Sequence, residues 1–309
     1  MKDSFGREIN YLRISVTRRC NFHCAYCGAA RPDARELTPE QFARFAAAFA
    51  RAGIAKIRLT GGEPLIREDI AAIAEAVGEA ASPETLAVTT NGFLLAQKAA
   101  ALKQAGVNAV NISLDTLDKE CFRRMTGRDA LSAVLEGLEA ALAQGFRRVK
   151  VNAVLLRGVN DGGAEKLFSL ARDYPVDVRF IELMPTGDGD ECRKRLIPSG
   201  ELLARFPALA PIPGEDGAAE YYAAEGFRGR VGLISPVSKK FCNNCSRIRL
   251  LADGRVKPCL GQQETYDLLP YLNEPDRLYE AVCQCIRNKP AGHHFEKAQG
   301  LAPMNQIGG

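Results

Sequence analysis

The most informative stretch of the chain is Tyr11-Leu-Arg-Ile-Ser-Val-Thr-Arg-Arg-Cys20-Asn-Phe-His-Cys24-Ala-Tyr-Cys27, where a strand-like run leads into three cysteines. Three neighbouring thiols can surround one soft metal centre, and thiolate ligands favour zinc or an iron–sulfur cluster. Zinc needs a fourth ligand. His23 is available, but it would have to bend the loop against its neighbours. A cubane held by three cysteines keeps one iron open for chemistry, so the spacing favours a cluster.

Working outward from this loop, runs of branched residues alternate with Ala- and Leu-rich amphipathic stretches. We expect strands near Leu12–Val16, Ile54–Leu59, Leu86–Thr89, Ala109–Leu114, Val149–Leu155 and Val178–Leu183. We expect helices over Pro39–Arg51, Asp69–Ala80, Leu94–Gln104, Ala130–Gln144 and Gly163–Asp173. Consecutive βα units imply an α/β fold with a parallel sheet, whose ligands gather at the carboxyl ends of the strands. The pattern does not distinguish a partial barrel from an open sheet.

The alternating pattern stops after Met184, and the remainder of the chain is less regular. Residues 185–229 are richer in Pro and Gly, and we expect a loop at Pro211–Gly214. A short strand-like run and the segment 241–260 follow. We then expect one or two helices, over Tyr266–Leu272 and Pro275–Arg287.

The composition is that of a globular protein, with 309 residues, 46% hydrophobic residues and a net charge of +4. This charge is too small for a nucleic-acid binder, although it suits an anionic small substrate. We find no secretory signal and no apolar run of about 18 residues, so we expect a cytoplasmic protein without a membrane span. Thiols stay reduced there, and clustered cysteines more often bind metal than form disulfides.

A second group of three thiols lies in the C-terminal part of the chain, at Cys242, Cys245 and Cys259. A zinc knuckle is the simpler alternative, with Cys283 or Cys285 as the fourth ligand. These two lie two residues apart on a predicted helix and face different ways, so we expect both to be buried. We also expect Cys121 and Cys192 to pack as small hydrophobic side chains, and the three histidines to be ordinary loop or surface residues.

Basic residues occupy several strand positions. Arg247 and Arg249 follow the second cysteine group, and on an extended segment their side chains point the same way. Further cations lie on the predicted strands, at Arg13, Arg58, Lys150 and Arg179. Charges in a helix-covered parallel sheet are costly unless they line a cavity. Six cations around one cavity would suit a polyanion such as a nucleoside triphosphate.

The second predicted strand ends in Arg58-Leu-Thr-Gly-Gly-Glu-Pro-Leu65. Paired glycines let a ligand approach the backbone closely, and Glu63 offers a carboxylate to an amine. Together with the three-cysteine loop, this segment resembles the radical S-adenosylmethionine (SAM) superfamily. The resemblance implies a partial (β/α)6 TIM-like barrel, in which a 4Fe–4S cluster binds SAM through its free iron. Reduction of that cluster then cleaves SAM to methionine and a 5′-deoxyadenosyl radical.

Within this superfamily the chain is similar to the MoaA family of GTP 3′,8-cyclases, which open molybdenum cofactor biosynthesis. The resemblance covers nearly the whole chain and includes Thr89-Thr-Asn-Gly92, Asn111-Ile-Ser-Leu-Asp115, Val149-Lys-Val-Asn152, Arg179-Phe-Ile-Glu-Leu-Met184, the Cys242 segment and Gly308-Gly309. The chain departs from the family pattern at Arg18, where an aspartate is usual, and at Gly28-Ala29, where Met-Pro is usual.

The resemblance implies roles for the matching positions. The SAM-cleaving 4Fe–4S cluster would be held by Cys20, Cys24 and Cys27, and the contacts to SAM would come from Tyr26, Gly62, Ser113 and Met184. A second 4Fe–4S cluster, whose free iron meets the guanine of GTP, would be held by Cys242, Cys245 and Cys259. GTP would be bound by Arg13, Arg58, Thr89, Lys150, Arg179, Arg247 and Arg249. Catalysis would involve Arg13, Arg247, Arg249 and a tail that ends in Gly308 and Gly309.

The resemblance divides the chain into a radical SAM partial barrel over residues 1–229 and a C-terminal auxiliary-cluster region over residues 230–309. It implies conversion of GTP to 3′,8-cyclo-7,8-dihydro-GTP, with SAM and two 4Fe–4S clusters as cofactors. It also implies a homodimer, an external electron donor and product handover to the next pathway enzyme, MoaC. Neither a nucleic acid nor a membrane is expected as a partner.

Three alternatives stay open from the sequence. A different radical SAM enzyme with an auxiliary cluster, such as one that modifies a peptide, would not require GTP. A nucleic-acid module that has lost catalysis would bind RNA or DNA in a salt-dependent way without SAM turnover. Two structural zinc sites would give about two zinc ions per chain and no acid-labile sulfide.

Overall fold

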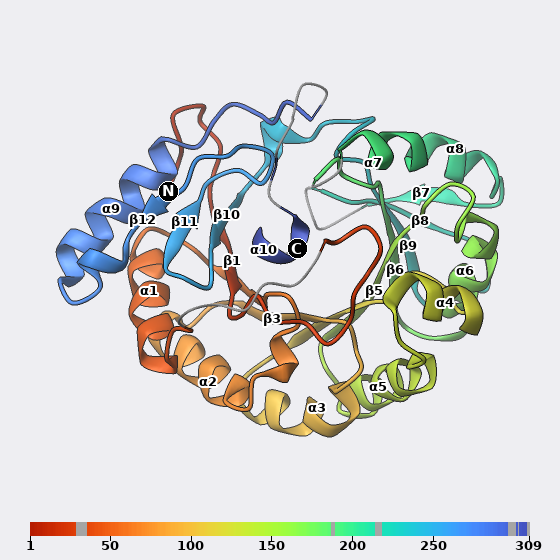
Figure 1. Cartoon of the computed structure of the whole chain (residues 1–309), viewed down its shortest axis with the longest axis horizontal. Helices are drawn as coiled ribbons and strands as arrows, with labels where there is room; N and C mark the ends of the chain where they lie inside the picture. Colours follow the sequence, from red (N-terminus) through yellow and green to blue (C-terminus); the bar gives the residue numbers. More distant parts are fainter. Residues whose placement is uncertain (29–35, 187–188, 214–217, 296–300, 302, 308–309) are drawn as a thin grey trace.

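The computed structural model describes residues 1–28, 36–186, 189–213, 218–295, 301 and 303–307. Within these residues, twelve strands form one sheet in the order β12-β11-β10-β1-β2-β3-β4-β5-β6-β9-β8-β7. Figure 1 shows this sheet curving, with most helices in an arc on its outer side and the short helix Met304–Ile307 on its inner side. The sheet ends at β12 and β7 and does not close on itself. The predicted partial barrel is therefore confirmed.

The six strands predicted for the barrel are present and pair in parallel in chain order. Their bounds are β1 (Tyr11–Ser15), β2 (Lys56–Thr60), β3 (Thr85–Thr90), β4 (Ala109–Ser113), β5 (Arg148–Val154) and β6 (Asp177–Ile181). Two later strands extend this set in parallel: β9 (Arg230–Ile234) pairs with β6, and β10 (Arg247–Leu250) pairs with β1. The sheet thus continues past residue 229, and the C-terminal part of the chain borders both sides of the barrel.

Helices connect the strands on the outer side of the sheet (Figure 1). Their bounds are α1 (Pro39–Arg51), α2 (Ile70–Ala81), α3 (Leu95–Gln104), α4 (Lys119–Thr126), α5 (Leu131–Ala143) and α6 (Ala164–Asp173). A capping box starts α1, because Thr38 and Gln41 each accept a hydrogen bond from the other's backbone N–H. Phe42, Phe45 and Phe49 then lie on one buried face of this helix. The unpredicted α4 has eight residues, too few for a clear periodic pattern.

The C-terminal predictions are partly wrong. The helix expected over Tyr266–Leu272 is instead β12 (Tyr266–Asp267) followed by a short turn, because Pro270 lacks the N–H that a helix interior needs. Two of the four residues of the loop expected at Pro211–Gly214 belong to β7 (Ala210–Ile212), which pairs with an adjacent strand, and Gly214 lies outside the described residues. The remaining elements are α7 (Gly189–Arg195), α8 (Ser199–Ala204), β8 (Glu220–Ala223), β11 (Arg255–Lys257), α9 (Pro275–Arg287) and α10 (Met304–Ile307).

The apolar core fills the space between the sheet and the outer helices, where Ile14, Leu59 and Val110 are fully buried beside the phenylalanines of α1. The inner side of the sheet carries polar and charged side chains instead. None of the helices in the described ranges is long and apolar enough to cross a bilayer.

Candidate active site

A cavity of about 570 Å³ lies on the inner side of the sheet. Every site residue predicted within the described ranges lines it, namely Arg13, Cys20, Cys24, Tyr26, Cys27, Arg58, Gly62, Thr89, Ser113, Lys150, Arg179, Met184, Cys242, Cys245, Arg247, Arg249 and Cys259. Gly308 and Gly309 lie outside the described residues. The two cysteine groups and the strand cations therefore share one chamber.

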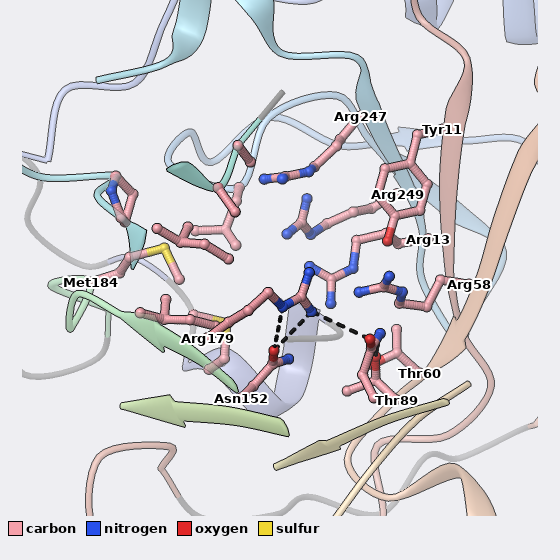
Figure 2. A pocket seen from close by; sticks show the side chains of 18 of the residues that line it. Tyr11, Arg13, Arg58, Thr60, Thr89, Asn152, Arg179, Met184, Arg247 and Arg249 are labelled. Carbon is pink, nitrogen blue, oxygen red and sulfur yellow. Dashed lines mark hydrogen bonds between the residues drawn. The ribbon is translucent and has the colours of Figure 1, made fainter. Parts of the chain in front are cut away.

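The strand register places arginines side by side. Arg13 on β1 is the partner of Arg249 on β10 and of Arg58 on β2, and Figure 2 shows Arg247 and Arg179 pointing toward the same group. Burial and the Arg249 charge lower the pKa of Arg13, while burial and Arg247 lower the pKa of Arg249 to about 10. With a pKa of about 10, Arg249 stays charged at neutral pH. Like charges directly opposite one another destabilise a sheet, and an anionic ligand in the cavity would offset this repulsion.

Polar side chains on β4, β5 and β8 contact the cations on the other side of the chamber. Arg179 donates to Asn152 Oδ1 from Nε (2.9 Å) and Nη2 (2.8 Å), and to Asn111 Oδ1 from Nη2 (3.3 Å) (Figure 2). The Lys150 ammonium donates to the Tyr221 hydroxyl at 3.3 Å. Both cations are almost fully buried. Their charges are thus held at defined places on the cavity wall.

The paired glycines after β2 allow close contact with the chain that enters the first cysteine loop (residues 20–27). A Cβ atom on Gly61 would lie 2.4 Å from the carbonyl oxygen of Thr17, and one on Gly62 would lie 2.3 Å from that of Arg19. Gly62 N also donates to Thr17 O at 2.8 Å. Any larger residue would push these segments apart. The glycines therefore set the position of the loop as well as lining the cavity.

Glu63 does not offer its carboxylate to the cavity, so that prediction is wrong. Its side chain is 1% exposed and does not line the cavity. The carboxylate instead accepts hydrogen bonds from Leu65 N (2.9 Å), the Thr90 hydroxyl (2.7 Å) and Asn91 N (2.6 Å). Burial raises the pKa of Glu63 to about 7, and these donors act in the opposite direction. The side chain fastens the end of β2 to the end of β3.

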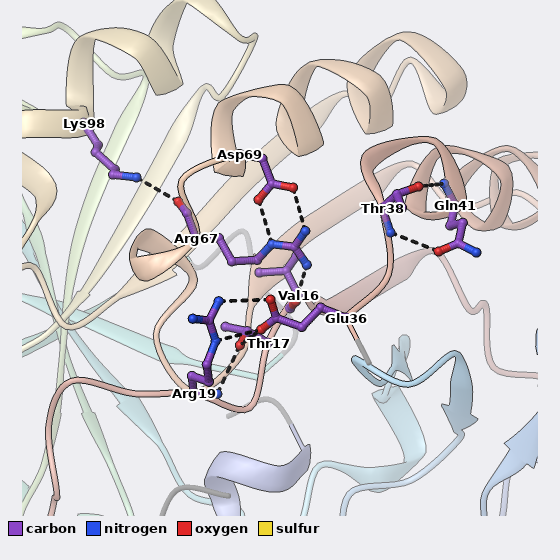
Figure 3. Close-up of polar contacts among 9 residues, drawn as sticks. All are labelled: Val16, Thr17, Arg19, Glu36, Thr38, Gln41, Arg67, Asp69 and Lys98. Atoms are coloured by element: carbon purple, nitrogen blue, oxygen red, sulfur yellow. Dashed lines mark hydrogen bonds and ion pairs between the residues drawn. The ribbon is translucent and has the colours of Figure 1, made fainter. Parts of the chain in front are cut away.

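Ionic contacts brace the same loop from outside (Figure 3). Glu36 accepts hydrogen bonds from the Thr17 hydroxyl and, at 2.9 and 3.0 Å, from the Arg19 guanidinium. The buried Arg67 donates to the carbonyl oxygen of Val16 at 2.9 Å. These contacts fix the segment after the C-terminal end of β1, which leads into the first cysteine loop.

Tyr26 is held by the end of β4. Its hydroxyl donates to Asp115 Oδ2 at 2.7 Å, and the other carboxylate oxygen accepts from Val154 N at 2.8 Å. Burial raises the pKa of Asp115 to about 6, against these two hydrogen bonds. Ser113, the last residue of β4, faces the same chamber. The predicted SAM contacts thus come from the carboxyl ends of neighbouring strands and the cysteine loop.

The second cysteine group lies at the β10 side of the cavity, with Cys242 and Cys245 before β10 and Cys259 after β11. Burial alone would raise the pKa of Cys245, but the Lys289 ammonium and the Arg247 guanidinium outweigh it and lower that pKa. Burial raises the pKa of Cys259. The cationic surroundings therefore favour the thiolate form, which binds metal, at Cys245.

The donor chemistry fits two clusters, each with one open iron. The ten cysteines form no disulfide. Cys283 and Cys285 are buried in the core, and His23 is exposed; none of the three lines the cavity, so the fourth ligands considered for zinc are not in place. Among the described side chains, no group of three His, Cys, Asp or Glu is already gathered at one point.

Sequence comparisons cover the whole chain. The radical SAM superfamily model matches residues 14–171, and the Molybdenum Cofactor Synthesis C model matches residues 176–295. A GTP 3′,8-cyclase of Alkaliphilus oremlandii is 42% identical, and one of Clostridium acetobutylicum is 40% identical, each with 100% of both chains covered. The chain belongs to the GTP 3′,8-cyclase family of radical SAM enzymes. The cofactors of this family are SAM and two 4Fe–4S clusters.

Solved structures agree on the fold. The structure of Streptococcus suis SuiB bound to S-adenosylmethionine has a TM-score of 0.67 and covers 91% of this chain and 68% of its own. Its sequence identity is 15%, so this likeness shows the fold alone.

The family's usual aspartate is replaced by Arg18, and the structure gives this arginine a partner. Arg18 forms an ion pair with Asp253, in the turn between β10 and β11, and Asp253 also pairs with Arg255 at 2.7 Å. Arg18 therefore links the segment that enters the first cysteine loop to the hairpin beside the second cysteine group.

Some cavity residues were not expected from the sequence. His293, predicted to be an ordinary loop residue, lines the cavity with its ring 4.0 Å from that of Phe295. The Tyr11 ring lies beneath the guanidinium groups of Arg58 (5.4 Å) and Arg247 (6.0 Å). Within the described residues, its buried hydroxyl has no hydrogen-bond partner. The only sequence signal for Tyr11 was its position two residues before a strand arginine.

The four remaining cysteines behave as predicted. Cys121 and Cys192 are buried in a small apolar cluster, and Cys283 and Cys285 are buried in the main core. Burial raises the pKa of Cys285 to about 12, which keeps this thiol protonated and inert.

Proposed function

We propose that this chain is a GTP 3′,8-cyclase that holds SAM and GTP together in the cavity and joins ribose C3′ to guanine C8. The observation that carries the proposal is the arginine row of β10, β1 and β2, which lies in one chamber with both three-thiol groups. The names of the full-length relatives and the C-terminal family match support the same reaction.

When bound, the first cluster and SAM would supply the radical chemistry that starts with removal of hydrogen from ribose C3′. Tyr26, Ser113 and Met184 would position SAM between the first cysteine loop and the carboxyl ends of β4 and β6. The backbone N–H of Gly62 already donates to the carbonyl oxygen of Thr17. Contact between Gly62 and SAM would therefore not use this N–H.

The cations would hold the triphosphate and exclude water from it. A nucleoside triphosphate brings about four negative charges, which would offset the repulsion within the row of Arg13, Arg58 and Arg249. Lys150 and Arg179 would bind from the facing strands, where Thr89 also lines the wall. With the phosphates fixed there, the base would extend toward the second cysteine group. Orientation of the reacting carbons is the protein's main contribution.

The direct test is turnover by anaerobically reconstituted protein supplied with SAM, a reductant and either GTP or ATP. We expect 5′-deoxyadenosine and the cyclic nucleotide to form in equal amounts with GTP and neither to form with ATP. An equal rate of SAM cleavage with and without GTP would favour the peptide-modifying alternative. Zinc without acid-labile sulfide in the purified protein would contradict the cluster assignment itself.

Several further features stay predictions of the family resemblance: the homodimer, the external electron donor, the transfer of product to MoaC, the cytoplasmic location and the division of the chain at residue 229. Entry of the Gly308-Gly309 tail into the site is also a prediction. It is supported by Met304 of α10, which lines the cavity.

A further inference from the structure

A buried lysine outside the predicted site lies beside the second cysteine group. Lys289 follows the end of α9 and is 3% exposed. Its ammonium donates hydrogen bonds to the carbonyl oxygens of Arg247 (2.8 Å) and Pro258 (2.7 Å). Arg247 starts β10 just after Cys245, and Pro258 directly precedes Cys259. One ammonium therefore joins the two backbone segments that carry these cysteines.

The Lys289 charge has no carboxylate partner in the part of the chain that the structure describes. The groups that can act on it with negative charge are the sulfurs of Cys245 and Cys259 when they are deprotonated, whereas Arg7 and Arg249 add like charge. An ammonium buried without a counter-charge is expensive, and hydrogen bonds to carbonyl oxygens offset only part of that cost. Neutral thiols would not complete the compensation, but a thiolate-ligated centre would.

The neighbouring cation Arg7, unlike Lys289, is paired with a carboxylate. Arg7 also reaches the second cysteine group, where it donates to the carbonyl oxygen of Cys242 at 2.9 Å. Its charge is already neutralised, because Nε lies 2.6 Å from Asp3 Oδ2. Unlike Arg7, Lys289 is held by two carbonyl oxygens on the segments that carry Cys245 and Cys259, and these two sulfurs are the groups that can offset its charge.

We propose that Lys289 is a positioning residue whose ammonium supplies a fixed positive charge beside the second iron–sulfur cluster. This charge would raise the reduction potential of that cluster. This inference rests on the second cluster of the proposed function. Reduction adds a negative charge to the cluster, so a nearby fixed positive charge stabilises the reduced form. The two carbonyl hydrogen bonds keep the ammonium at a fixed place beside the ligand segments.

The test is a redox titration of the full-length chain in a Cys20→Ser/Cys24→Ser/Cys27→Ser background, in which only the second cluster contributes to the spectrum. Lys289→Met removes the charge, and Lys289→Arg keeps it. Lys103→Met is the matched control, because Lys103 also donates to a carbonyl oxygen, that of Gly145 at 2.8 Å, on the exposed side of α3. Iron and acid-labile sulfide are measured in each variant.

We expect Lys289→Met to lower the ratio of reduced to oxidised cluster about tenfold at a fixed applied potential, which is about 59 mV for a one-electron couple. Lys289→Arg and Lys103→Met should leave the ratio unchanged. An unchanged ratio in Lys289→Met, or a ratio in Lys289→Arg that falls equally, overturns the proposal.

If Lys289→Met assembles no cluster, Lys289→Arg decides the outcome. Iron and sulfide restored by arginine would support the need for a positive charge, and their absence in both variants would show a steric role and overturn it. A background protein that itself lacks the second cluster would contradict the proposed function instead.

Discussion

Two arginines on one short strand have different surroundings. Arg249 is 6% exposed and lies in register between its neighbours, where its buried Nε has no hydrogen-bond partner within the described residues. Arg247 packs its guanidinium over the rings of Phe241 (5.3 Å) and Tyr11 (6.0 Å). Both line the cavity. At the scale of single residues, the site therefore consists of guanidinium groups whose planes are set by packing while their charge faces the chamber.

Arg247→Ala and Arg249→Ala should each weaken GTP binding about 10- to 100-fold, which corresponds to the loss of a charged hydrogen bond worth about 1.5–3 kcal/mol. Isothermal titration of the reconstituted protein measures this. Iron content should not change. Arg255→Ala is the matched control, since Arg255 is an exposed strand arginine already paired with Asp253. Loss of the second cluster in either cavity variant would show that the arginine supports folding and not substrate binding.

Asp115 predicts a pH dependence of stability. Burial raises its pKa from 3.8 to about 6, so the folded chain binds this proton more tightly than the unfolded chain does. The free energy of unfolding should therefore fall as pH rises from about 4 to 6, by at most about 3 kcal/mol.

Asp115→Asn removes this titration. The stability of the variant relative to the parent should accordingly be more favourable at pH 7 than at pH 4.5, as measured by urea unfolding of the apoprotein. An equal difference at both pH values would show that the carboxyl group titrates normally.

At the scale of elements, the end of β2 positions the first cysteine loop. The two glycines contact the backbone of residues 17–19 at distances that admit no side chain, and Glu63 fastens the same end to β3. The outer contacts of Glu36 and Arg67 complete the support (Figure 3). The loop is thus held from both sides before any metal binds.

Gly62→Ala should displace this loop, because the new Cβ would meet Arg19 O at 2.3 Å. We expect iron and acid-labile sulfide to fall by about half as the first cluster is lost while the second remains. Gly200→Ala, at a helical glycine with no atom within 4 Å of the added Cβ, should leave both at parental levels. A Gly62→Ala protein with full iron content would mean that the loop does not depend on this close packing.

Element prediction from the sequence succeeded where periodicity was strong. The bounds of α1 and α9 agree with the prediction, and the barrel strands differ from it by one or two residues at their ends. Periodicity could not show that the Glu63 carboxylate accepts hydrogen bonds from two backbone N–H groups and the Thr90 hydroxyl. It also could not find Lys289, whose carbonyl partners lie 42 and 31 residues away in the chain. Such contacts depend on tertiary packing rather than local pattern.

At the scale of the whole molecule, the return of β10 to the side of β1 forms the site. This pairing puts Arg249 beside Arg13 and brings the second cysteine group to the chamber of the first. The sequence carried the motifs of both groups and the family's fold. The sequence motifs did not predict the register of β10 against β1, which depends on β9 and β10 extending opposite sides of the barrel. The family's two cofactor sites and a polyanion site therefore converge through topology.

The central claim is that one chamber holds SAM within reach of the GTP ribose. The most direct test is anaerobic turnover with GTP deuterated at C3′, followed by mass spectrometry of the 5′-deoxyadenosine formed. Direct hydrogen transfer between two ligands in the same cavity predicts 5′-deoxyadenosine that carries one deuterium. Unlabelled 5′-deoxyadenosine, formed at the same rate whether or not GTP is present, would contradict the account.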